Sequence, residues 1–209
     1  MKFVVFVEGE TEKTAVVGFL KRWLDARLSK PVGVVPVFSR GWSDYLDSIQ
    51  EKVRRQLAPK GGVDIVAAVG LLDLYGLTIY PPGVETIGER YAWARLHVET
   101  KVGHPKFIQH FAVHESEAWL LGDAKVLPER VQKALSKQAR EKPETVNFDE
   151  PPAKLLERLY REKERRRYKK VTDGTDLFLK VSPDQVYAAC PYLRKLLDEM
   201  LAMGKDAGL

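Results

Sequence analysis

A chain of 209 residues, of which 44% are hydrophobic, is long enough to bury a substantial core as one domain or as one domain with an appended lobe. Its apolar runs are all shorter than the roughly 18 residues that cross a bilayer, and its first residues lack the apolar segment of a signal peptide. We therefore expect a cytoplasmic protein without a membrane partner. The single cysteine, Cys190, excludes an internal disulfide and a CxxC zinc site, and we expect its side chain to be buried.

The net charge of +5 is concentrated in one stretch of the chain. Residues 151–170 contain nine Lys or Arg and three Glu, a net charge of +6, so the other 189 residues together carry about −1. A basic block on a nearly neutral body is typical of a surface that contacts phosphates. A solvated helix face is the alternative.

The first predicted element is a buried strand that ends in acidic residues. Residues 3–7 are a continuous run of β-branched and aromatic side chains, which is typical of a central strand covered on both faces. Glu8 follows at its carboxyl end, and Glu12 comes soon after. Open α/β sheets bind ligands at the carboxyl ends of their strands, so we expect a positive group beside Glu8.

The next elements alternate between helix and strand. Apolar periodicity predicts a helix over residues 11–26 with Thr11 as its N-cap, and a second helix over residues 43–57. Between them, residues 32–38 are predicted to form a strand, which Pro36 assigns to an edge or bulge position. The order so far is βαβα.

A second strongly apolar strand is predicted over residues 63–72, and it ends in Asp73. If this strand is a neighbour of the first, Glu8 and Asp73 lie at the same edge of one sheet. Mg²⁺ is typically held by one or two carboxylates together with waters and substrate phosphates. The pair therefore indicates metal-assisted phosphate chemistry.

A third acidic cluster follows the next helix and strand. A helix over residues 85–102 and a strand over residues 107–113 lead into His114, Glu115 and Glu117, which do not form an HExxH zinc motif. His114 is a candidate proton shuttle or orienting group, with a structural role as the alternative. The other histidines have no such context, and we expect them to be ordinary helix, turn and strand residues: His97, His104 and His110.

The last part of the chain is predicted to be helical. Segments near residues 128–138, 152–169 and 182–200 have helical periodicity, and polar residues 141–150 and 173–174 separate them. The basic helix among them would present an apolar face and a cationic one. Its i,i+4 ion pairs permit a purely structural role, but three Glu cannot neutralise nine cations. We expect nucleic-acid contact from these side chains: Lys154, Arg161, Arg165, Arg166 and Arg167.

The order strand, Glu8-Gly9, helix, strand, helix, strand, Asp73 resembles the Toprim domain of topoisomerases, primases and OLD-type nucleases. In that domain a glutamate after the first strand and an Asp-x-Asp motif after the third bind Mg²⁺, which implies this role for Glu8 and Asp73. The resemblance covers roughly residues 2–115. Tyr75 stands at the second aspartate, so either Glu115 or Glu117 substitutes for it or the metal site is weakened.

A closer resemblance spans almost the whole chain. The segments VEGETE, DLYG, HESEAWLL, PPAKLL and ACPYLRKLL, which begin at residues 7, 73, 114, 151 and 189, are similar to those of an uncharacterised Toprim-like family. That family is catalogued as a domain of unknown function, and its members often sit beside ABC-type ATPases in prokaryotic defence loci. The resemblance implies an ABC-type ATPase as a partner.

These observations predict an α/β, Toprim-like fold. We expect a mostly parallel sheet flanked by helices over residues 1–122, and a helical C-terminal extension over residues 123–209 that packs on it. The expected function is that of a Mg²⁺- or Mn²⁺-dependent nuclease or related phosphodiester-processing protein, with DNA favoured over RNA. The alternative is a non-catalytic nucleic-acid-binding or regulatory partner of the ATPase. A homodimer is compatible with either.

The predicted site combines acidic residues from three strand ends. Glu8 and Asp73 would hold the metal, and Glu115 and Glu117 would complete its ligands or position water. Glu12 is a weaker candidate ligand. Tyr75 keeps the non-catalytic alternative open.

Overall fold

The structure is a computed structural model that describes the chain except residues 10–11, 59–64 and 146–149 and the side chains of residues 12 and 13. At its centre is an all-parallel sheet with the strand order β2-β1-β3-β4. The strands are β1 Lys2–Val7, β2 Gly33–Phe38, β3 Ile65–Asp73 and β4 Phe107–Ala112. The predicted α/β fold with a parallel sheet flanked by helices is confirmed.

The two most apolar strands occupy the centre of the sheet. In β1 and β3 nearly every residue is buried, because helices cover both faces. The strand β2 is half-exposed and lies at one edge, where Pro36 is tolerated because a sheet edge leaves one row of backbone groups unpaired. The prediction for Pro36 is confirmed.

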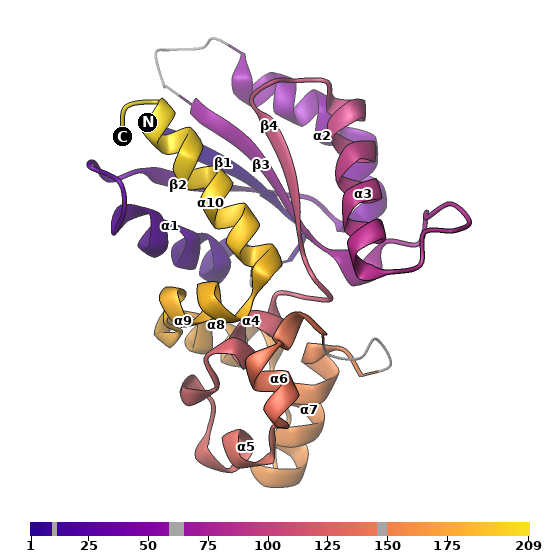
Figure 1. Ribbon diagram of the computed structural model, residues 1–209, viewed down its shortest axis with the longest axis vertical. Helices are drawn as coiled ribbons and strands as arrows, with labels where there is room; N and C mark the ends of the chain where they lie inside the picture. The colour runs from indigo at the N-terminus through magenta and orange to yellow at the C-terminus, as the bar shows by residue number, and fades with distance from the viewer. Residues whose placement is uncertain (10–11, 59–64, 146–149) are drawn as a thin grey trace.

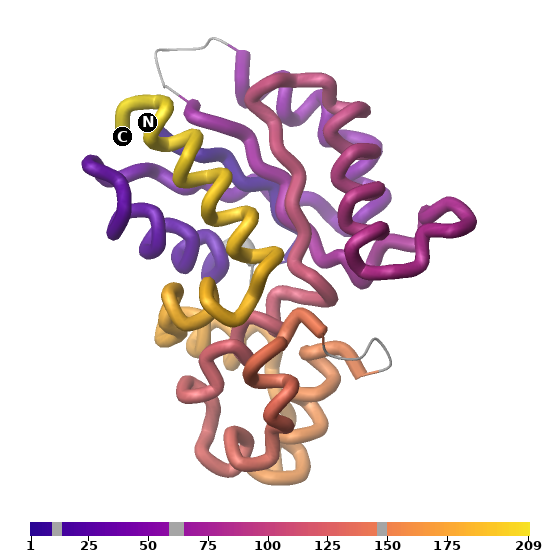
Figure 2. The backbone as a smooth tube through the Cα atoms, in the orientation of Figure 1, coloured from indigo at the N-terminus to yellow at the C-terminus, as the bar shows by residue number. Residues whose placement is uncertain are grey.

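Two pairs of helices cover the faces of the sheet (Figures 1 and 2). On one face, α1 Val17–Asp25 and α10 Pro191–Asp206 pack against the side chains of Phe3, Val5 and Val7. On the other face, α2 Gly41–Leu57 and α3 Ile87–Val102 pack against Val4 and Phe6. This alternation follows from the two-residue period of a strand. The last helix of the chain therefore completes the layer that the first helix begins.

The remaining helices form a lobe at the end of the molecule where β4 leads into α4 (Figure 1). They are α4 Glu117–Gly122, α5 Glu129–Ala134, α6 Lys137–Glu141, α7 Pro152–Lys163, α8 Lys170–Lys180 and α9 Pro183–Ala189. Short turns of other helix types also occur: η1 Glu12–Val16, η2 Leu74–Gly76, η3 Ala124–Val126 and η4 Pro143–Thr145. Across the residues that the structure describes, no helix is long and apolar enough to cross a membrane.

Several predicted boundaries in the C-terminal part are wrong. The segment near residues 128–138 is two helices, α5 and α6, and Ser136 caps the second through its side chain. The segment over residues 182–200 breaks at the buried Cys190, because the residue before a proline avoids the helical conformation and Pro191 starts a new helix.

The basic segment is also shorter than predicted. Helix α7 ends at Lys163 rather than Lys169, and Arg165 has a left-handed backbone with φ of 53°. The following residues 173–174, predicted to separate helices, lie inside α8. Two predictions fall outside the described residues: Thr11 as the cap of the first helix, and residues 63–64 as the start of the second apolar strand.

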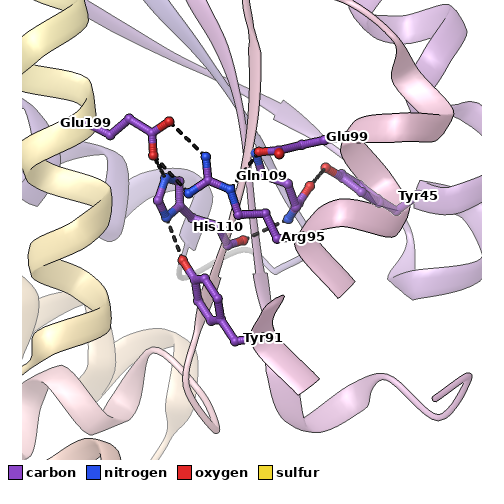
Figure 3. A network of polar contacts seen from close by, with 7 residues as sticks. All are labelled: Tyr45, Tyr91, Arg95, Glu99, Gln109, His110 and Glu199. Carbon is purple, nitrogen blue, oxygen red and sulfur yellow. Dashed lines mark hydrogen bonds and ion pairs between the residues drawn. The ribbon is translucent and has the colours of Figure 1, made fainter. Parts of the chain in front are cut away.

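A buried polar network fastens α3 and α10 to β4 (Figure 3). His110 has no exposed surface; its Nδ1 lies 2.6 Å from the Tyr91 hydroxyl and its Nε2 lies 2.9 Å from Glu199 Oε2. Arg95 donates to both Glu199 oxygens at 2.8 and 3.0 Å and to Glu99 at 2.8 Å. His110 is thus a strand residue as expected, with a ring that joins three elements.

The network also fixes the charges of its members. Burial alone would raise the pKa of Glu199, but hydrogen bonds from His110 and Arg95 outweigh burial and lower this pKa to about 2. Burial lowers the pKa of His110, so its ring is neutral at pH 7. Arg95 is then the cation that balances Glu199.

Candidate functional site

Glu8 and Asp73 stand at the carboxyl ends of the two central strands. Glu8 follows β1 directly, and Asp73 is the last residue of β3, which pairs with β1 in parallel. The chain leaves β1 for β2 through α1 on one face of the sheet and leaves β3 for β4 through α3 on the other face. The two carboxylates therefore flank the topological switch point, where open α/β sheets bind their ligands.

A cavity of about 480 Å³ lies at this switch point, and both carboxylates line it. Gly9 and the β3 residues Leu71 and Leu72 also line it, and the other lining residues come from the end of β2, from the start of α2 and from the start of α8: Phe38, Arg40, Gly41, Lys170 and Val171. The cavity thus contains two acidic and two basic side chains. The structure brings Glu8 and Asp73 together in one cavity, as the strand-end argument predicts.

Lys170 forms ion pairs at this edge of the sheet, and it was not predicted as a site residue. Its ammonium nitrogen lies 3.2 Å from Glu117 Oε2 and 3.8 Å from Asp73 Oδ2. The side chain of Lys170 is 39% exposed, whereas that of Glu117 is fully buried. A buried carboxylate requires a paired charge, and Lys170 supplies it. The sequence predicts a positive group beside Glu8; the structure places Lys170 beside Asp73, in the wall of the cavity that Glu8 also lines.

The turn after β4 is bonded to the end of β3. The Ser116 N–H donates to Asp73 Oδ1 at 3.1 Å, and the Tyr75 N–H donates to the His114 carbonyl at 3.1 Å. Trp42 Nε1 donates to the Asp73 carbonyl at 3.2 Å. These bonds hold Asp73 in place from its backbone and from its side chain, so its orientation is set before any ligand binds.

Glu115 and Glu117 have different surroundings. Glu117 contacts Lys170 and receives a 3.5 Å contact from the Ser116 hydroxyl. Glu115 is half-buried and accepts a hydrogen bond from the Ala153 N–H at 2.9 Å, in the first turn of α7. A carboxylate at a helix N-terminus is stabilised by the helix dipole and by the N–H groups that have no partner within the helix. Glu115 thus joins the lobe to the sheet, and Glu117 is the one of the two that shares a cation with Asp73.

His114 is buried and neutral. Its side chain has no exposed surface, and its backbone adopts a left-handed conformation with φ of 64°. Burial lowers the pKa of His114 to about 4, opposed by a contact with the Glu144 backbone. An imidazole with this pKa is neutral at pH 7, with one ring N–H and one free ring nitrogen, so as a proton shuttle it would begin by accepting a proton.

Among the side chains that the structure describes, the predicted ligands do not form a metal site of three carboxylates. Tyr75 is 42% exposed, and the side chain of Glu12 lies outside the described residues. Within the described part of the chain, no group of three or more His, Cys, Asp or Glu is arranged to hold a metal ion. Two carboxylates with waters are nevertheless within the ligand set that Mg²⁺ accepts. Glu8 and Asp73 fit such a site provided that Lys170 withdraws from Asp73.

The predicted nucleic-acid contacts separate into two groups. Arg166 donates to both Asp173 oxygens at 2.8 and 2.9 Å and lies over the Tyr160 ring at 4.7 Å, so it holds the loop between α7 and α8. All five predicted side chains are exposed to solvent, and the second group consists of the other four: Lys154, Arg161, Arg165 and Arg167. The second group precedes Lys170 in the chain, so the loop that carries Arg165 and Arg167 leads directly to the cavity.

The fold and the site define an α/β protein whose two central parallel strands end in carboxylates that share a cavity with a lysine. A family model described as a domain of unknown function, DUF4276, matches residues 7–201. The chain belongs to this family. Searches of curated proteins and of solved structures find no match. The matched region includes both strand ends and the whole helical lobe.

Proposed function

We propose that this protein is a Mg²⁺-dependent phosphodiester hydrolase, a Toprim-like nuclease related to the OLD type. The observation that carries the proposal is the shared cavity of Glu8 and Asp73 at the switch point of a parallel sheet, with Lys170 and Arg40 in its wall. Carboxylates and cations in one cavity suit a divalent metal and a phosphate together. Mn²⁺ would be an alternative ion.

The charged residues of the cavity, and Ser116 beside it, have distinct roles in this proposal. Glu8 and Asp73 would hold the ion, which when bound would polarise a phosphoryl oxygen and stabilise the charge of the transition state. Ser116 would keep Asp73 oriented through its N–H, 3.1 Å from Oδ1. Arg40 would attract the phosphate backbone to the cavity.

Lys170 would exchange partners when metal and substrate bind. In the structure it neutralises Asp73 and Glu117, so a divalent ion at Asp73 would repel it. A lysine side chain is long and flexible, and this one is 39% exposed, so it can turn from Asp73 toward a substrate phosphate. Glu117, buried and fixed, would keep the ammonium group within the cavity.

The exposed cations of the α7–α8 region would extend the contact with nucleic acid. Lys154, Arg161, Arg165 and Arg167 would bind the backbone without reading bases, since phosphate contacts carry no sequence information. Arg166, bound to Asp173, would keep the loop in shape. The proposed substrate is DNA in preference to RNA, in a prokaryotic defence system.

Two observations favour a second candidate function, a non-catalytic nucleic-acid-binding or regulatory partner of an ABC-type ATPase. Lys170 already balances the charge of Asp73, and the exposed Tyr75 stands where a Toprim domain has its second aspartate. In such a partner the lysine would replace the metal permanently. The fold and the nucleic-acid surface would be kept without hydrolysis.

Cleavage assays separate the two candidates. Plasmid, linear duplex and single-stranded DNA and RNA would be incubated with Mg²⁺ or Mn²⁺ and with wild type, Asp73→Asn or Tyr75→Asp protein, with and without an ATPase encoded alongside. The hydrolase predicts cleavage by wild type and loss in Asp73→Asn. Equal cleavage by these two would indicate a contaminating nuclease. Absence of cleavage by every protein, even with the ATPase, would favour the non-catalytic partner.

A further inference from the structure

Two exposed aromatic side chains occur at the edge of the sheet where the cavity lies. Among the described residues, Phe38 and Tyr75 are the two exposed members of the Phe, Tyr and Trp side chains, at 37% and 42%. Phe38 is the last residue of β2 and lines the cavity together with Glu8 and Asp73. Tyr75 lies in the turn η2, two residues after Asp73. Both therefore occur at carboxyl ends of strands, at the same edge of the sheet as the carboxylates.

Their exposure contrasts with the rest of the molecule. The aromatic side chains elsewhere in the described chain are buried or half-buried, many of them in the two cores. Phe38 and the apolar side chain of Val171, which is 57% exposed, both line the cavity, and Tyr75 lies at the same edge of the sheet. Single exposed apolar residues are normal, but several of them around one cavity indicate a binding surface.

The charges around the cavity restrict what can bind to this surface. Arg40 and Lys170 line the same cavity as Phe38, and the loop before Lys170 exposes Arg165 and Arg167. A ligand that is flat and apolar on one side and anionic on the other satisfies both features. Unpaired nucleotides have these properties, because bases stack on aromatic rings while phosphates bind to cations. In a duplex the bases are stacked on each other and leave no face for Phe38 or Tyr75.

We propose that the cavity binds single-stranded nucleic acid, with bases stacked on Phe38 and Tyr75 and the backbone held by Arg40 and Lys170. The proposal names the substrate class of the site described above and in that sense rests on the proposed function, but stacking itself requires no metal. A strand bound in this way would pass the phosphodiester backbone over Glu8 and Asp73. The preferred substrate would then be a single strand, or the frayed end of a duplex.

The test is a binding measurement without divalent metal, so that it does not depend on hydrolysis. Fluorescence anisotropy in EDTA would compare oligothymidylate, an abasic oligonucleotide of equal length and charge, and a blunt duplex. Oligothymidylate is expected to bind most tightly of the three. Phe38→Ala and Tyr75→Ala should each weaken its binding by roughly tenfold and leave the affinity for the abasic oligonucleotide unaffected. Phe38→Trp and Tyr75→Phe should retain binding, since they keep an aromatic face.

A matched control is available on α3, outside the cavity wall. Leu96 is 67% exposed and does not line the cavity, so Leu96→Ala removes a similar apolar surface and should leave the affinity for every oligonucleotide unchanged. Equal affinity for the abasic oligonucleotide and oligothymidylate, or equal effects of Phe38→Ala and Leu96→Ala, would overturn the proposal. So would a change of oligomeric state on gel filtration with unchanged DNA binding, which would assign the patch to a second copy of the chain.

The outcome is separable from that of the proposed function. If single strands bind through the aromatic pair but no protein cleaves them with Mg²⁺, the hydrolase is wrong and the single-strand site is retained. If DNA is cleaved but the aromatic variants bind and cleave as wild type does, the reverse holds.

Discussion

Glu199→Gln tests whether the polar network of Figure 3 holds the last helix against the sheet by charge. The substitution keeps the shape of the side chain and removes the charge that pairs with Arg95. The pKa of Glu199 falls from its ordinary value of 4.5 to about 2, which corresponds to roughly 3 kcal/mol of folding free energy. Because 32% of this side chain is exposed, solvent screening reduces the expected loss to about 1–2 kcal/mol.

The pH dependence gives the sharper result. The folded pKa of Glu199 lies below the unfolded one, so its contribution is fully present above about pH 4.5 and is lost as the pH falls toward 2. Urea unfolding at pH 7 should therefore separate wild type from Glu199→Gln, and the difference should shrink to less than half at pH 3. Asp198→Asn, an exposed neighbour on α10, is the control and should have little effect at either pH. A difference between wild type and Glu199→Gln that is the same at both pH values would refute the ionic explanation.

Three further predictions address the site and the sheet. Lys170→Met should raise Mg²⁺ affinity by roughly fivefold in calorimetric titration, because it removes the Lys170–Asp73 ion pair, worth up to about 1 kcal/mol, that competes with the metal. Unchanged affinity would mean that Lys170 does not compete with the metal. Removing Arg165 and Arg167 should lower the slope of log affinity for nucleic acid against log salt by about 0.7–0.9 for each phosphate that the variant no longer neutralises. A salt series identical to that of wild type would mean that Arg165 and Arg167 are a solvated surface. Arg166→Ala should instead lower the free energy of unfolding by about 1 kcal/mol. Gly70→Ala would drive its Cβ into the side-chain oxygen of the buried Gln109 and should destabilise the protein by about 2–4 kcal/mol in urea unfolding. An unfolding midpoint equal to that of wild type would contradict this packing.

The buried strands and the acidic residues at their ends could be predicted because both depend on local patterns, whereas the shared position of Glu8 and Asp73 also required β1 and β3 to be neighbours, as the structure shows. Continuous apolar runs identify buried parallel strands, and the residue that follows such a strand must lie at its carboxyl edge. The role of Glu8 and Asp73 in holding a metal remains a prediction, as does the role of the basic residues in binding nucleic acid.

Lys170 could not be placed from the sequence, because its neighbours on the chain indicate a different structure. The residues between Lys163 and Lys170 are good helix formers, so periodicity continues the basic helix through them. The break between α7 and α8 depends on Asp173, which accepts hydrogen bonds from the Lys169 N–H at 2.6 Å and from the Arg166 side chain. An acidic residue in what becomes the first turn of α8 was a signal for a helix start there.

The polar network was beyond sequence reasoning for another reason. Glu199 and His110 are 89 residues apart, and neither lies in a motif with a recognisable spacing. Their contact exists because α10 returns to the sheet beside β4. Such a pair can be found only after the helices have been placed.

The most direct test of the central claim is a Mg²⁺ titration by calorimetry of wild type, Glu8→Gln, Asp73→Asn and the double variant. If the two carboxylates hold one ion together, each single change should remove most of the affinity, and the double change should cost little more than either alone. Asp47→Asn, an exposed acid on α2, is the matched control and should bind as wild type does. Wild-type affinity in both single variants, or heat that disappears equally in Asp47→Asn, would contradict a metal site at the switch point.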